Sequence, residues 1–171
     1  MAGINEGLQY LKSVPGVLKI LEIIFLLVCI APVGYFLQKA SDNHLGDFDR
    51  KDNLKFLVGA AATAAVVALL LFLIFLSGLH KKIDALNWAR TAAGIFLILA
   101  ILLLVASSLV ADTVRYYKSY PGFGMQDVNL CQIFEKSKRE YRCGQLTAGA
   151  VFGFIVMVAF IVDSVIHFRL Y

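Results

Sequence analysis

The chain has 171 residues, of which 60% are apolar and 16% charged, and its formal net charge is +4. Its mean hydropathy is +0.77. A soluble domain averages about 45–50% apolar and about 25% charged residues, and a small domain has too little interior to bury such an excess. The composition therefore excludes a water-soluble domain and favours the bilayer as solvent. No basic stretch indicates nucleic-acid binding.

Four long apolar runs predict transmembrane helices, at about residues 17–38, 56–79, 91–111 and 147–168. A helix needs about 20 residues to cross a hydrocarbon core of about 30 Å, and a helix satisfies its own backbone polar groups there. We therefore expect one all-α domain over residues 1–171, an integral membrane four-helix bundle with antiparallel up-down topology. Ahead of the first run, "NEGLQYLKSVPG" predicts a short surface-lying helix that contains Tyr10 and ends before Pro15.

Two acidic residues lie inside apolar runs, Glu22 in the first and Asp163 in the fourth. Such residues are costly in a membrane and are often functional. Antiparallel packing puts both at the same level, near one membrane face. Two interpretations stay open. Lys19, three residues before Glu22, and His167, four after Asp163, can satisfy them within each helix; alternatively, the acids form a shared polar site for a cation, a proton or a lipid headgroup.

Small residues at four-residue spacing predict close helix packing. The second run contains Ala60, Ala64 and Ala68, and the fourth contains Gly149 and Gly153. Such spacing lets helix backbones approach closely in lipid, where no hydrophobic force drives helices together. We expect these faces to pack the bundle internally, and the Leu- and Phe-rich faces to meet lipid.

The longest connection, residues 112–146, contains Cys131 and Cys143. Disulfides persist in oxidising compartments, so the pair predicts a disulfide facing the lumen or cell exterior, with both termini in the cytosol. Two free cysteines, or a palmitoylated one in a cytosolic loop, are the alternatives. Lysine and arginine counts do not settle the orientation. With cytosolic termini, the short basic loop that carries Lys81, Lys82 and Arg90 lies against the inner leaflet.

Motifs of catalysis are absent from the sequence: there is no CxxC pair, no HExxH, no phosphate-binding glycine loop and no serine elbow. His44, His80 and His167 lie in different regions and do not form a ligand cluster. We therefore expect no enzyme activity, no catalytic residues, no cofactor and no metal.

The segments "GVLKILEIIFLLVCIA", with Glu22, and "AGAVFGFIVMVAFIVDSVIHFR", with Asp163, resemble the MARVEL-domain family. The branch most similar is that of the chemokine-like factors, MAL, plasmolipin and singles bar. This resemblance implies a scaffold that organises lipids or membrane proteins in vesicle trafficking, membrane apposition or fusion, or cell junctions. It implies the plasma membrane or secretory-pathway vesicles as location, and leaves a homo-oligomer open.

Three other functions compete with a scaffold. The chain could be an auxiliary subunit of a channel or receptor, or a small transporter or channel that uses Glu22 and Asp163. A small intramembrane lipid-modifying enzyme is the third.

Overall fold

The structure of the chain is a computed structural model, described here for residues 7–42, 50–79, 87–119, 129–132 and 142–170. Its helices are α1 (Gly7–Leu11), α2 (Val14–Asp42), α3 (Lys51–Leu76), α4 (Trp88–Ser119) and α6 (Cys143–Leu170). In the described part of the chain, four of them, α2, α3, α4 and α6, are long and apolar enough to cross a membrane. The predicted all-α fold with four spans is confirmed.

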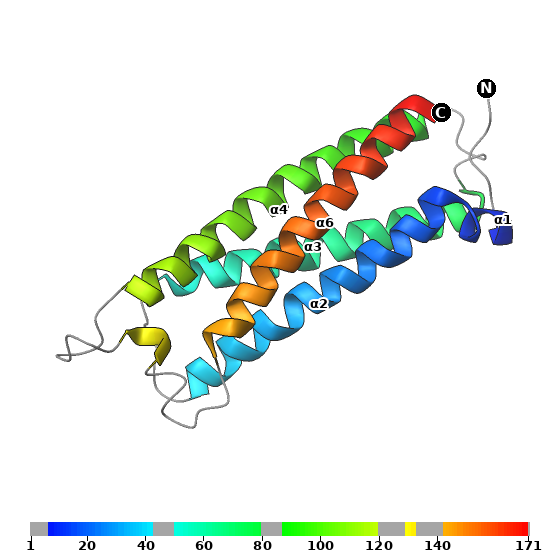
Figure 1. The fold of residues 1–171 in the computed structure, drawn as a ribbon. Coiled ribbons are helices and arrows are strands. Elements are labelled where there is room, and N and C mark those ends of the chain that lie inside the picture. The colour runs from blue at the N-terminus through cyan, green and yellow to red at the C-terminus, as the bar shows by residue number, and fades with distance from the viewer. Residues whose placement is uncertain (1–6, 43–49, 80–86, 120–128, 133–141, 171) are drawn as a thin grey trace.

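The four long helices form a ring in which each packs against two neighbours. Helix α2 contacts α3 and α6, and α4 contacts the same two helices, with the most extensive contact between α4 and α6. The chain runs up and down the bundle, so the start of α2 and the end of α6 lie at the same end (Figure 1). The placement of that end in the cytosol remains a prediction.

The helices are longer than the apolar runs that predicted them. Helix α2 continues to Asp42 and α4 continues to Ser119, beyond the expected ends at 38 and 111. An apolar run marks only the segment that suits hydrocarbon, whereas the backbone hydrogen bonds of a helix continue into the polar interface. At this end of the bundle, Asn53 of α3 donates a side-chain hydrogen bond of 3.0 Å to Thr113 of α4, which supports the extra turns.

The expectation that phenylalanine faces meet lipid is wrong for part of the chain. Phe36, Phe75, Phe96 and Phe160 are fully buried, whereas branched aliphatic side chains such as Ile98, 66% exposed, cover much of the outside. Small residues line the same interior, so large rings are needed to fill the remaining space, because protein interiors are close-packed.

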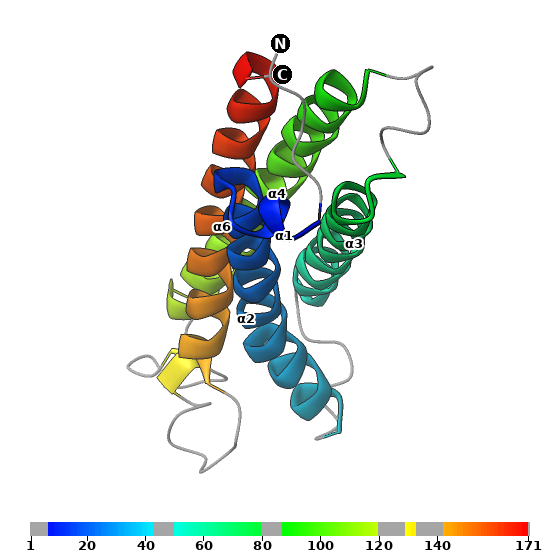
Figure 2. The ribbon, with the colours of Figure 1, turned by 90° about the vertical axis from the view of Figure 1, so that its right-hand side faces the viewer.

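Helix α1 closes one end of the bundle. The short helix was expected, but Tyr10 is fully buried rather than surface-lying. Its ring centroid lies 5.9 Å from that of Phe72 and 5.7 Å from that of Phe75, both on α3. Figure 2 shows α1 across the start of α2, beside α3. Gly16 permits this fold-back, since a Cβ atom there would collide with the carbonyl oxygen of Tyr10.

A buried ionic cluster between α2 and α6

Four polar side chains meet inside the bundle: Lys19 and Glu22 of α2 with Asp163 and His167 of α6, each 0% exposed. The Lys19 ammonium lies 2.5 Å from a Glu22 carboxylate oxygen and also forms an ion pair with Asp163 across the α2–α6 interface. The His167 Nδ1 atom lies 3.1 Å from the other Asp163 carboxylate oxygen. Both local contacts that helical spacing predicted are therefore present, and Lys19 links Glu22 to Asp163. A site for a cation, a proton or a lipid headgroup remains a prediction. We call these four residues the ionic cluster.

Aromatic rings surround the ionic cluster. The Lys19 ammonium lies 3.4 Å from the ring centroid of Phe96 on α4 and 5.1 Å from that of Phe160 on α6. The His167 ring centroid is 5.3 Å from that of Phe96 and 5.8 Å from that of Phe75 on α3. A cation over a ring face is attracted by the ring quadrupole, and more strongly when desolvated. All four long helices thus contribute side chains to this one region.

The ionic cluster contains one lysine and two carboxyl groups. Lys19 supplies one positive charge against two carboxyl groups, Glu22 and Asp163. An uncompensated charge buried away from water is strongly unfavourable, so burial of these carboxyl groups depends on the Lys19 ammonium between them. Chemically, the cluster can hold α2 and α6 together; in the described part of the chain no group of three His, Cys, Asp or Glu residues could hold a metal ion.

The glycines at four-residue spacing lie where α6 meets two other helices. A Cβ atom on Gly149 would collide with Val33 of α2 and would lie 3.3 Å from the Cys29 carbonyl oxygen. The Cys29 thiol donates a 3.2 Å hydrogen bond to the Gly149 carbonyl oxygen. A Cβ atom on Gly153 would collide with the Ser107 hydroxyl of α4. The alanines of α3, Ala60, Ala64 and Ala68, are all buried.

A comparison with protein-family models finds one family that matches most of the chain. The family model described as "MARVEL: Membrane-associating domain" matches residues 10–166. The chain belongs to the MARVEL family. The match starts at Tyr10, includes the carboxyl groups of the ionic cluster and ends one residue before His167. Searches of curated proteins and of solved structures gave no significant match. With four apolar spans, this MARVEL chain is an integral membrane protein; the branch within the family stays a prediction.

The opposite end of the MARVEL bundle carries the predicted disulfide. Cys131 and Cys143 are bonded, with their Cα atoms 5.6 Å apart, and Cys143 is the first residue of α6. Most of the charged segment between them, residues 133–141, lies outside the described residues, as do Lys81 and Lys82 of the basic loop. Arg90 is exposed on the first turn of α4, at the same end as the ionic cluster.

Three residues that contribute to the site were not singled out in the sequence: Phe75, Phe96 and Phe160. Each lies in an apolar run rich in similar residues, so spacing alone gives no signal for them. Only the rotation of each helix about its axis brings these rings to the ionic cluster.

Proposed function

We propose that this MARVEL protein is a non-enzymatic membrane scaffold that organises lipids or membrane-protein partners by lateral contact. The settings proposed are vesicle trafficking, membrane apposition or fusion, and cell junctions, at the plasma membrane or on secretory-pathway vesicles. One observation carries the proposal: the side chains of Lys19, Glu22, Asp163 and His167 are fully buried against one another in the ionic cluster. These groups stabilise the bundle, so contacts with lipids and with other membrane proteins are made by the apolar outer faces of the helices.

The outer faces suit such lateral contacts. Leu70 of α3, Ile98 of α4 and Val158 of α6 are 54%, 66% and 53% exposed. Without water, helices associate in lipid through packing rather than through a hydrophobic force. Apolar surfaces on three helices therefore support contact with lipid chains and with the spans of other proteins.

The geometry supports a scaffold over a transporter. A transported ion needs polar groups that it can reach and leave, and transporters usually place them near the bilayer midplane. Here Lys19 already occupies the space between Glu22 and Asp163. Aromatic rings surround it, and Tyr10 covers the adjacent end of the interior.

Site-directed photo-crosslinking in intact cells tests the scaffold. A photoreactive amino acid is placed in turn at Leu70, Ile98 and Val158, one on each of three helices. We expect at least one of the three positions to crosslink to a membrane protein of discrete mass. The positions that give only lipid adducts serve as matched controls. Lipid adducts alone at all three positions would contradict lateral contact with a protein through these faces.

Flux measurements separate the competing function. The purified full chain in proteoliposomes should carry no proton or cation flux above that of protein-free vesicles. Flux that disappears in Glu22→Gln or Asp163→Asn would instead establish a transporter and remove the scaffold as the primary function.

A further inference from the structure

A groove of about 580 Å³ lies between α4 and α6, at the end of the bundle that contains the ionic cluster. Its lining residues are Arg90, Ala93, Gly94 and Leu97 of α4, with Ser164, Val165, Phe168 and Arg169 of α6. Ligand pockets in proteins typically measure about 300–1,000 Å³ and are mostly apolar with a few polar groups. The groove matches this description.

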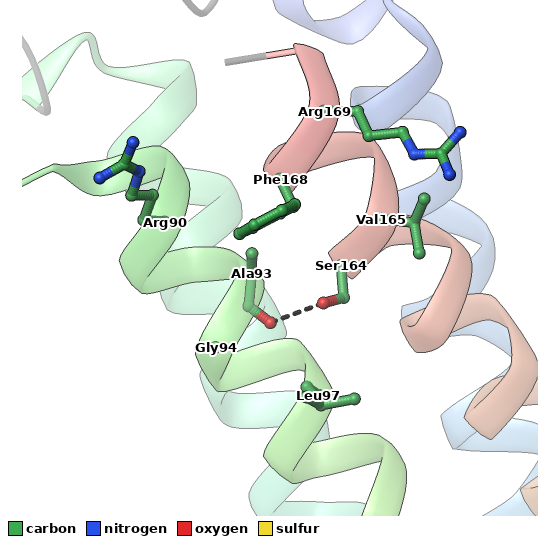
Figure 3. Close-up of a pocket in the computed structure, with 8 residues that line it drawn as sticks. All are labelled: Arg90, Ala93, Gly94, Leu97, Ser164, Val165, Phe168 and Arg169. Carbon is green, nitrogen blue, oxygen red and sulfur yellow. Dashed lines mark hydrogen bonds between the residues drawn. The ribbon is translucent and has the colours of Figure 1, made fainter.

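Small residues and one hydrogen bond form the floor of the groove. Ser164 donates a 2.8 Å hydrogen bond to the carbonyl oxygen of Ala93, which ties the two helices together (Figure 3). Gly94 is exposed, and a Cβ atom there would have no neighbour within 4 Å. Phe168, 71% exposed, extends its ring between the helices. An apolar chain could therefore lie along the groove against Gly94, Leu97 and Phe168.

The mouth of the groove is basic. Figure 3 shows Arg90 and Arg169 on its two flanks, with guanidinium groups that point away from the groove and from each other. Both are exposed, and each long stem lets the charged head move while its methylene groups stay against apolar surface. Among the described residues at this end, the exposed charged side chains are Lys12, Arg90 and Arg169, all basic, whereas both acids are buried in the ionic cluster.

We propose that this groove binds an anionic glycerophospholipid, with its phosphate near Arg90 and Arg169 and an acyl chain along Leu97 and Phe168. Guanidinium groups bind phosphate oxygens in bidentate geometry, and basic pockets between spans suit anionic headgroups. The apolar floor selects a lipid over a soluble phosphate. The proposal rests on the proposed scaffold function and names one of its ligand classes; lipid binding can fail while the protein crosslinks above persist, so the two are tested separately.

Native mass spectrometry of the full chain in detergent tests this site. The probes are phosphatidylserine and phosphatidylcholine with identical acyl chains. We expect phosphatidylserine to bind the unchanged protein at least about tenfold more tightly, and Arg90→Gln/Arg169→Gln to abolish that preference, since each basic residue near an anionic surface contributes measurably. Arg90→Lys/Arg169→Lys keeps the charge and should retain a preference. Equal binding of both lipids to the unchanged protein would overturn the proposal.

Two matched controls sharpen the result. Arg115→Gln/Arg142→Gln removes two exposed charges at the opposite end and should leave the preference intact; an equal loss there would mean nonspecific charge attraction and would overturn the site. Gly94→Leu fills the groove and should weaken both lipids, whereas Gly59→Leu, at an exposed glycine of α3 with equally open space, should not. Binding of soluble glycerophosphoserine as tight as that of phosphatidylserine would show that the apolar floor is unused, and would also contradict the proposal.

Discussion

Lys19 on α2 and Asp163 on α6 form an ion pair in which both side chains are completely buried. The same ammonium pairs with Glu22 on its own helix. The first and last long helices of the chain are therefore linked by a buried charge pair, and removing one partner of such a pair leaves the other uncompensated. The interior of this MARVEL bundle is specified at this position by charge as well as by packing.

The disulfide predicts how the cysteines react with a membrane-impermeant maleimide. Cys131 and Cys143 are bonded and only 5% and 2% exposed, and Cys29 is buried in α2, so intact cells should show little labelling without reductant. Mild reduction breaks the bond that holds the two side chains in place, so label should then enter Cys131 and Cys143 from the extracellular side of intact cells, or from the lumenal side of opened vesicles. Labelling of the reduced pair only from the cytosolic side would reverse the proposed orientation of the bundle.

Gly153 should not tolerate even a methyl group without cost. The Cβ atom of Gly153→Ala would collide with the Ser107 hydroxyl on α4, and overpacking of this kind costs about 1–3 kcal/mol of unfolding free energy. SDS-induced unfolding in mixed micelles measures the loss. Adding Ser107→Ala removes the colliding oxygen, so the double variant should be more stable than Gly153→Ala alone.

The control for this prediction is Gly59→Ala. Gly59 is exposed on α3, and its Cβ position has no neighbour within 4 Å. The unfolding free energy of Gly59→Ala should be unchanged or slightly raised, since alanine favours a helix over glycine by about 1 kcal/mol. Equal destabilisation by both substitutions would show that Gly153 has no special role in packing.

How far the sequence could predict this structure depends on the kind of contact. The four spans follow from apolar length, and the pairs Lys19–Glu22 and Asp163–His167 follow from helical spacing. The link from Lys19 to Asp163 could not be predicted, because it depends on which faces of two helices meet. In a soluble helix, the polar face marks the side that points to water, so the opposite face can be assigned to the interior. In lipid both the inner and the outer faces of a helix are apolar, so the sequence does not show which face meets another helix. For the same reason, the burial of Phe96 beside Lys19 gave no signal in the sequence.

The ion pair between Arg50 and Asp112, at the other end of the bundle, should contribute much less to stability than the buried ionic cluster. It joins Arg50, the residue just before α3, to α4, but its side chains are 32% and 60% exposed. Exposed pairs contribute roughly 0–1 kcal/mol, because water and salt screen them. Asp112→Asn should therefore change the unfolding free energy by less than about 1 kcal/mol. A loss comparable to that from a buried charge would mean that this end of the bundle is shielded from water.

The most direct test of the ionic cluster is the unfolding free energy of Lys19→Met, measured by SDS titration beside that of the triple variant Lys19→Met/Glu22→Gln/Asp163→Asn. The single substitution leaves two carboxyl groups without their cation and should cost about 3–5 kcal/mol. The triple variant removes the charges together, so it should recover most of that loss. A triple variant as unstable as Lys19→Met, or a single variant as stable as the unchanged protein, would contradict the claim that charge compensation inside the ionic cluster holds α2 to α6.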